Sequence, residues 1–196
     1  MFTRSELRQN LLGSLEVALF MRTGTGRFSA SRESMKRSFM IPVVLLPLTV
    51  ASVLAAHPEK LDIASMQALA LIYTLRLFVY LAGFLALVYS MARSMDRLDS
   101  FYRFATANNW LTLPAAVIMF PVLALFLNGY YTWAEIYPLM VFMTLYSYAY
   151  TAFMTTYVLR VPFELACFVA IAGMALHQTS LEALKWVAVN ALMMVS

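Results

Sequence analysis

The stretch that decides the fold is MQALALIYTLRLFVYLAGFLALVYSM, residues 66–91, an apolar run long enough to cross a lipid bilayer. A helix needs about 20 predominantly apolar residues to span the hydrocarbon core. The run contains one charged residue, Arg76, and no proline, whereas every other apolar run before residue 181 contains proline. Because proline bends helices, the stretch predicts one long, straight span with a cation near its middle.

The composition of the whole chain agrees with a membrane protein. Of its 196 residues 62% are hydrophobic and 12% are charged, whereas a soluble domain is about 45–50% apolar and about 25% charged. The net charge of +4 is too small to indicate a nucleic-acid partner. Cys167 is the only cysteine, which excludes an intrachain disulfide and a cysteine-based metal site.

Together with residues 66–91, the rest of the sequence predicts an all-α fold, a polytopic membrane helix bundle with five transmembrane helices. It divides into a cytoplasmic amphipathic and basic segment (1–38), a five-span bundle (39–177) and an apolar C-terminal tail (178–196). The apolar part of the tail, 181–195, is shorter than an ordinary span, so an interfacial helix, a short sixth span and a continuation of span five all remain open. The five predicted spans are residues 39–56, 66–91, 110–127, 134–159 and 161–177.

Residues 1–22 predict an amphipathic helix. Thr3 and Glu6 have the spacing of a capping box, in which a hydroxyl and a carboxylate satisfy free backbone N–H groups at the start of a helix. An apolar face at helical spacing suits either the membrane surface or packing against the protein's own spans. The apolar residues of that face are Leu7, Leu11, Leu12, Leu15, Ala18 and Leu19, and the cations expected to meet anionic headgroups are Arg4, Arg8 and Arg22.

The basic residues predict the topology. Seven lie in segment 1–38, three in segment 92–109 and one at Arg160, all on one side of a five-span bundle. The positive-inside rule then places the N-terminus in the cytoplasm and the C-terminus outside, in a bacterial inner membrane. Four of these residues, just before the first span, are expected either to contact acidic lipid headgroups or only to set topology. They are Arg27, Arg32, Lys36 and Arg37.

Arg76 is the sharpest candidate for a polar site inside the membrane. An arginine at the centre of a span costs about 2.5–3.5 kcal/mol, so it normally faces protein or water. Tyr73 and Tyr80 share its face of the predicted helix, and Ser147 and Thr151 belong to a hydroxyl stripe in span four that can hydrogen-bond across helices. Two roles stay open: an anion or lipid-headgroup site inside the bundle, or a structural hydrogen-bonding hub.

No sequence pattern points to catalysis, a metal or a cofactor. The two histidines, His57 and His177, fall at the predicted outer ends of spans and are expected to be surface residues. Two histidines without a neighbouring carboxylate or thiolate make a poor metal site. There is no Gly-rich phosphate loop and no HExxH sequence. The chain is therefore expected to be no enzyme and to hold neither cofactor nor metal.

Two local sequences carry a resemblance to a known family. FSAS at 28–31 leads into RSF at 37–39, and SFYR at 100–103 is followed by Trp110 and Pro114. With the five-span layout, these sequences make the chain resemble the Yip1-domain membrane proteins, in particular the short bacterial members. The resemblance implies the same membrane layout and no catalytic motif. Eukaryotic members are implicated in membrane trafficking with small GTPases, a role that we do not carry over.

These observations favour a non-enzymatic inner-membrane protein that scaffolds or assists other membrane components. Its expected partners are membrane lipids and either another membrane protein or further copies of itself. One alternative is a small transporter or channel subunit with a site near Arg76, because proline-broken spans expose carbonyls to substrates. The remaining alternative is a membrane-embedded enzyme acting on lipids.

Overall fold

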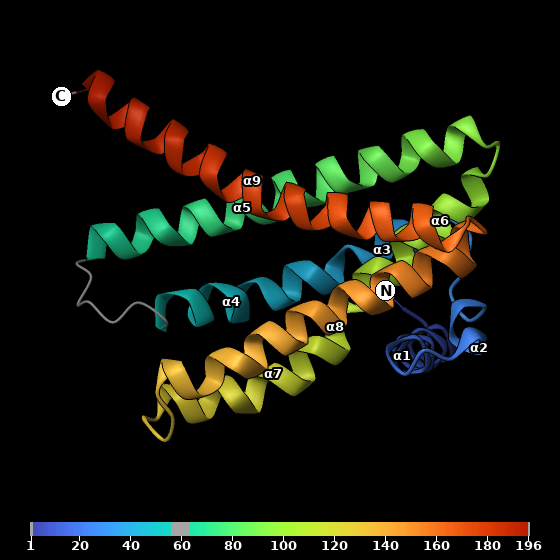
Figure 1. The fold of residues 1–196 in the computed structure, drawn as a ribbon, viewed down its shortest axis with the longest axis horizontal. Coiled ribbons are helices and arrows are strands. Elements are labelled where there is room, and N and C mark those ends of the chain that lie inside the picture. Colours follow the sequence, from blue (N-terminus) through green and yellow to red (C-terminus); the bar gives the residue numbers. More distant parts are fainter. Residues whose placement is uncertain (1, 56–62, 196) are drawn as a thin grey trace.

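The computed structural model describes residues 2–55 and 63–195, and the elements in these ranges are all helices. The five long helices lie side by side along the long axis of the molecule, while the short helices gather at one end (Figure 1). The helices are α1 (Arg4–Ala18), α2 (Arg22–Thr25), α3 (Arg32–Ser38), α4 (Met40–Ala55), α5 (Ile63–Ser94), α6 (Leu98–Trp110), α7 (Thr112–Leu127), α8 (Trp133–Leu159) and α9 (Phe163–Val195).

Four helical stretches are long and apolar enough to cross a membrane: Arg32–Ala51, Ser65–Ser94, Leu98–Leu127 and Phe163–Ala188. The protein is therefore membrane-embedded, as its composition predicted. The remaining predicted span, residues 134–159, corresponds to α8, which has 27 residues but is not among the four. Its length is sufficient, but its many tyrosines, threonines and serines lower its hydropathy.

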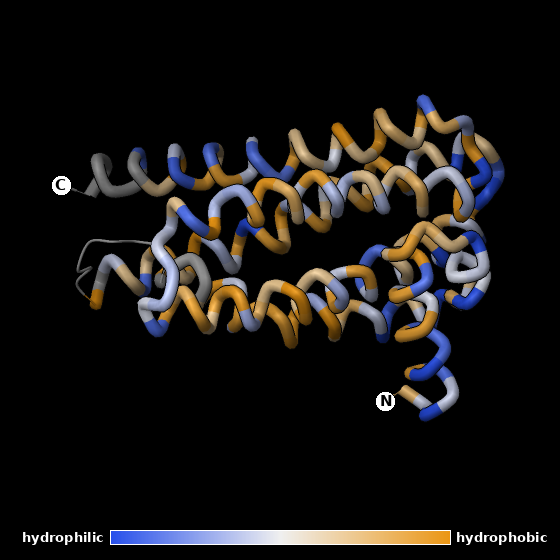
Figure 2. The backbone as a smooth tube through the Cα atoms, turned by 60° about the horizontal axis from the view of Figure 1, so that its bottom comes forward, coloured by the Kyte–Doolittle hydropathy of each residue, from blue (hydrophilic) through white to orange (hydrophobic). Residues whose placement is uncertain are grey.

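The molecule has two regions along its length. We call residues 2–39, 83–111 and 150–173 the compact end, and residues 40–55, 63–82, 112–149 and 174–195 the open half. Among buried hydrophobic residues whose environment is described, prolines aside, only Ile136 lies in the open half. The long helices are coloured mostly as hydrophobic, whereas hydrophilic residues gather around the short helices of the compact end (Figure 2). The core is thus built where α1–α3 and α6 join the ends of α5, α8 and α9.

Local chemistry explains the two chain reversals at the compact end. Between α5 and α6 the chain turns at Asp96, whose positive φ of 55° is a conformation that aspartate tolerates better than most residues. Between α8 and α9 it turns at Arg160, with φ 54°. Arg97 Nη1 donates to the carbonyls of Leu159 and Arg160, at 2.9 and 2.8 Å. It thereby satisfies acceptors that the end of a helix leaves free.

The C-terminal tail continues α9, which was one of the three alternatives for it. α9 runs for 33 residues from Phe163 to Val195. Thr179 and Glu182 also have the spacing of a capping box, but they lie inside α9 and start no helix, and the Thr179 hydroxyl donates to the Ala175 carbonyl one turn earlier. The same T-x-x-E spacing does start α8, where Thr132 and Glu135 form a capping box that the sequence analysis did not identify.

Candidate functional site

The structure brings Arg76 of α5 against His177 of α9. Arg76 Nε and Nη2 donate to the His177 carbonyl at 3.1 and 2.9 Å, and Nη2 also lies 2.9 Å from His177 Nδ1. Because a guanidinium has no acceptor, Nδ1 must be the acceptor, and a neutral ring then carries its proton on Nε2. One arginine thus ties two long helices together through one histidine.

The expectation that His177 is a surface residue at the end of a span was wrong. His177 lies in the middle part of α9 and not at its end, because this helix continues well beyond it to Val195. The residue is only partly exposed. The predicted span 161–177 ended at His177, so the residue was expected too close to the membrane surface. The prediction for His57 falls outside the described residues.

Two of the predicted tyrosines surround this pair. The Arg76 guanidinium carbon lies 5.5 Å from the centre of the Tyr73 ring, within the range of a cation–π contact. Tyr80 meets the His177 ring edge-on, with ring centres 5.2 Å apart, and stacks on Phe84 at 5.8 Å. The helical spacing of residues 73, 76 and 80 brings all three to one side of α5. These contacts are those of a hydrogen-bonding and packing centre between α5 and α9.

A cavity of about 290 Å³ adjoins the pair, and we call it the polar cavity. Of the predicted site residues, Tyr80, Ser147 and Thr151 line it, whereas Arg76 and Tyr73 do not. His177 also lines the cavity and so connects it to Arg76. The sequence analysis did not place His177 in this group, and it did not consider the further polar lining residues Asn108 and Tyr150.

Among the residues that the structure describes, the hydroxyl stripe donates no hydrogen bond to another helix, contrary to the prediction. Ser147, Thr151 and Thr155 each donate at 2.7 Å to a carbonyl three or four residues earlier in α8 itself. Hydroxyls inside a helix commonly bond to the preceding turn in this way. Ser147 and Thr151 therefore face the polar cavity as acceptors, with their protons already engaged.

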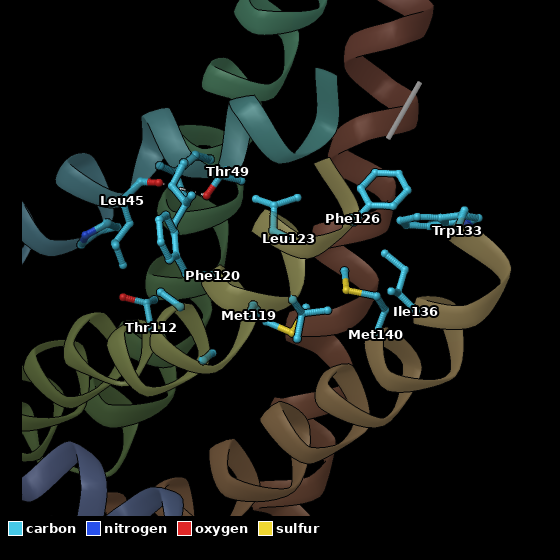
Figure 3. A pocket seen from close by; sticks show the side chains of 16 residues that line it. Leu45, Thr49, Thr112, Met119, Phe120, Leu123, Phe126, Trp133, Ile136 and Met140 are labelled. Atoms are coloured by element: carbon cyan, nitrogen blue, oxygen red, sulfur yellow. Dashed lines mark hydrogen bonds between the residues drawn. The ribbon is translucent and has the colours of Figure 1, made fainter. Parts of the chain in front are cut away.

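A second, larger cavity of about 440 Å³ lies among α4, α7 and α8, and we call it the apolar cavity. Its labelled lining includes Leu45, Met119, Phe120 and Met140, which point toward one another from three helices (Figure 3). The apolar cavity and the polar cavity share Pro42, Leu77 and Thr112. The two spaces therefore adjoin, with an apolar compartment leading to a polar one.

Two of the four predicted lipid-binding cations form ion pairs within the protein. Arg27 holds the Glu16 carboxylate through Nε at 2.9 Å and Nη2 at 2.6 Å, and Arg37 Nη2 holds Glu6 at 2.9 Å. The hydrogen bonds from Arg27 lower the pKa of Glu16. These pairs attach α1 to the chain that follows it. The other two predicted cations, Arg32 and Lys36, are exposed.

A second basic group lies at the turns of the compact end, and the sequence analysis used it only for topology. Arg93, Arg103 and Arg160 border a hollow of about 620 Å³ together with Asp96 and Asp99. Arg93 belongs to the end of α5, Arg103 to α6 and Arg160 to the turn between α8 and α9, so their proximity is a property of the fold. The mixed charges and the capping role of Arg97 described above make this a solvated surface.

Among the residues that the structure describes, no group of three or more His, Cys, Asp or Glu residues lies close enough to hold a metal ion.

No family model, no curated protein and no solved structure matches this chain. The site is therefore defined by its own geometry, which is an interhelical Arg76–His177 centre beside two adjoining cavities.

Proposed function

We propose that this chain is a non-enzymatic membrane protein with five spans that holds or assists another membrane component through its open half. The span that this proposal adds to the four long apolar stretches is α8. The N-terminus lies in the cytoplasm, the C-terminus outside, and the membrane is a bacterial inner membrane. The resemblance to short bacterial Yip1-domain proteins supports the same membrane layout.

The observation that carries the proposal is the outward direction of large apolar side chains in the open half. Val117 is 70% exposed, Leu145 is 62% exposed and Phe142 is 58% exposed. The apolar cavity gives the open half a concave site, and Phe120 and Met119 point into it (Figure 3). A membrane partner recognises such a surface by packing into it, because lipid supplies no hydrophobic force between helices.

In-cell photo-cross-linking tests this proposal. Benzoylphenylalanine replaces either Phe120, which is 56% exposed in the open half, or Phe168, which is 59% exposed at the compact end. We expect Phe120 to give one discrete protein adduct, either with a second membrane protein or with another copy of this chain. The matched position Phe168 should give none.

Lipid adducts alone from Phe120, and from Phe142 as a second open-half position, contradict the proposal. Equal protein adducts from Phe120 and Phe168 contradict the assignment to the open half. Both outcomes are readable without knowing the partner, because the adduct is separated by mass and identified afterwards.

A second candidate function is a small transporter or channel subunit, and the polar cavity beside His177 favours it. A water-accessible space next to an intramembrane arginine is typical of substrate pathways. Thr151 lines the polar cavity, and Cys167 is the only native thiol. In a Cys167→Ser background, a transporter predicts that Thr151→Cys reacts with a membrane-impermeant maleimide in sealed vesicles. Failure to react, with Gln9→Cys reacting as the accessible control, contradicts this candidate.

A further inference from the structure

Helix α1 turns its apolar side away from the protein. Leu7, Leu11 and Leu12 are 42%, 38% and 37% exposed, and Leu15 and Leu19 are 52% and 68% exposed. We call these five residues the leucine face. The side that packs against the rest of the molecule consists instead of small or polar residues, and its buried members are Asn10, Gly13, Ser14, Val17 and Ala18. Of the two uses predicted for this apolar face, the structure favours the membrane surface, because Ala18 is its only buried member.

Three attachments hold α1 in this orientation. Glu6 is bound by Arg37 at 2.9 Å, and Glu16 is bound by Arg27 through two hydrogen bonds. At Gly24 the chain passes so close that an added Cβ would come within 2.7 Å of the Gly13 carbonyl oxygen. Rotation of the leucine face toward the protein would break both ion pairs and separate this close contact.

Contacts at its two ends place α1 across the long helices. Near one end, the Phe2 ring packs on Trp110 with ring centres 5.2 Å apart, immediately before α7 begins. At the other end, the Tyr146 hydroxyl donates to the Ala18 carbonyl. One turn along α8 from Tyr146, Tyr150 donates to the Leu111 carbonyl at 3.4 Å, which sets this level of α8 beside the start of α7.

Both ends of α1 therefore lie at the level at which α7 enters its apolar stretch. Figure 1 accordingly looks almost along α1, while the long helices run across the page. A helix that crosses the spans at this depth meets the surface of the bilayer.

The exposed cations of α1 complement the surface that it meets. Arg4 and Arg8 are exposed on the same side of α1 as the leucine face. Arg22 follows the helix and lies over the Tyr157 ring at 4.6 Å. Arginine beside an apolar helix face suits a leaflet that contains anionic lipids.

We infer that α1 is an interfacial anchor whose leucine face inserts into a leaflet containing anionic phospholipid, with Arg4 and Arg8 among the headgroups. The anchor extends the protein sideways along the cytoplasmic surface of the membrane. This inference does not depend on the partner proposed above, because it concerns the opposite region of the molecule.

Spin labels on the full chain, reconstituted into bilayers of phosphatidylcholine with phosphatidylglycerol, test the inference. All variants carry Cys167→Ser, with a single label at Leu15→Cys on the leucine face or at Gln9→Cys, an exposed polar position on the same helix. Oxygen concentrates in lipid and a nickel chelate stays in water. We expect oxygen collisions to dominate at Leu15 and nickel collisions to dominate at Gln9.

A second arm tests the charge. Arg4→Gln with Arg8→Gln, or bilayers of phosphatidylcholine alone, should shift the Leu15 label toward nickel collisions and leave the Gln9 label unchanged. Dominant nickel collisions at Leu15 in the anionic bilayer overturn the inference, because the leucine face is then in water. Protection of Leu15 from both reagents also overturns it, because a protein then covers the face. Insensitivity of Leu15 to the arginine changes and to lipid charge overturns the anionic part.

Discussion

The compact end and the open half are made largely by the same helices, yet nearly all of the buried apolar side chains that the structure describes lie in the compact end. In the compact end, Phe84 and Val88 of α5 are 1% and 0% exposed. In the open half, Leu71 of the same helix is 59% exposed and Phe78 is 50% exposed. A single helix therefore changes from a core element to an open one within a few turns.

The physical reason is the surrounding solvent. Apolar surface is driven out of water but not out of hydrocarbon, so only the part of the bundle that meets water needs to bury it. The compact end behaves like the core of a small soluble domain placed at one end of the long helices. Stability should therefore be concentrated there, and the open half should tolerate changes that the compact end does not. The following experiments test this difference.

The largest expected effect is the loss of a core side chain. Phe104 of α6 is 0% exposed and Phe120 of α7 is 56% exposed. Phe104→Ala should cost about 3–5 kcal/mol of unfolding free energy, as for other buried phenylalanines. Phe120→Ala should stay within about 0.5 kcal/mol, as at other exposed positions. Unfolding in a denaturing detergent series measures both, and equal losses would remove the distinction between the two regions.

The next effect arises where α5 and α9 meet at the boundary of the regions. A Cβ added at Gly173 would come within 2.9 Å of Phe84 Cε2, whereas one added at Gly83 would meet only Leu176 at 3.7 Å. Because Phe84 is buried and cannot move freely, Gly173→Ala should cost about 1–3 kcal/mol through overpacking. Gly83→Ala should be neutral or stabilising by up to about 1 kcal/mol, since alanine favours helices. Thermal unfolding of both variants in one detergent gives the comparison. A stabilised Gly173→Ala protein would show that the helices are not so close.

The sequence was sufficient to predict the membrane class and the long helices. Apolar runs, prolines and interfacial aromatic residues identify a span regardless of what packs against it. The lack of proline in residues 66–91 predicted one long helix, and α5 extends for 32 residues to Ser94. The orientation of α1 was left undecided, because the same leucine spacing serves a core and a membrane surface equally well.

The site was only partly predictable. Arg76, Tyr73 and Tyr80 follow from spacing within one helix, but His177 lies 101 residues from Arg76 in the chain. The position of His177 along its helix depends on where α9 ends. The sequence does not mark that end, because the helix continues through polar residues beyond the apolar run. The hydroxyl stripe was predicted, but its hydrogen-bond acceptors were not. A sequence pattern is equally compatible with acceptors in the same helix and in a neighbouring helix.

A smaller effect is expected from the Arg76–His177 pair, which links α5 and α9 beside the polar cavity. Interhelical hydrogen bonds in membranes contribute on average about 0.6 kcal/mol and at most about 1.7 kcal/mol. The coupling energy between Arg76→Met and His177→Phe in a double-mutant cycle should lie in this range. A cycle that closes to zero would mean that the contact with Nδ1 contributes nothing and that Arg76 holds α9 only through the His177 carbonyl, which His177→Phe keeps.

The smallest effect concerns the ion pair that fastens α1 to α3 at the compact end. Partial burial acts to raise the pKa of Glu6, but the hydrogen bonds from Arg37 and Ser34 outweigh it and hold the pKa below its ordinary value of 4.5. A carboxyl with a lowered pKa in the folded protein stabilises it above the unfolded pKa, and this stabilisation is lost as pH falls through the folded pKa.

We therefore expect Glu6→Gln to lose about 0.2–1 kcal/mol at neutral pH, the range of exposed ion pairs, and to lose nothing at a pH below the folded value. Glu33→Gln is the matched control, because Glu33 is exposed on α3 and forms no ion pair with the residues that the structure describes. Unfolding measured at several pH values between neutral and acid separates the two variants. If wild type and Glu6→Gln keep the same difference at every pH, the contribution of Glu6 comes from packing, and α1 is held to the compact end by its close glycine contact.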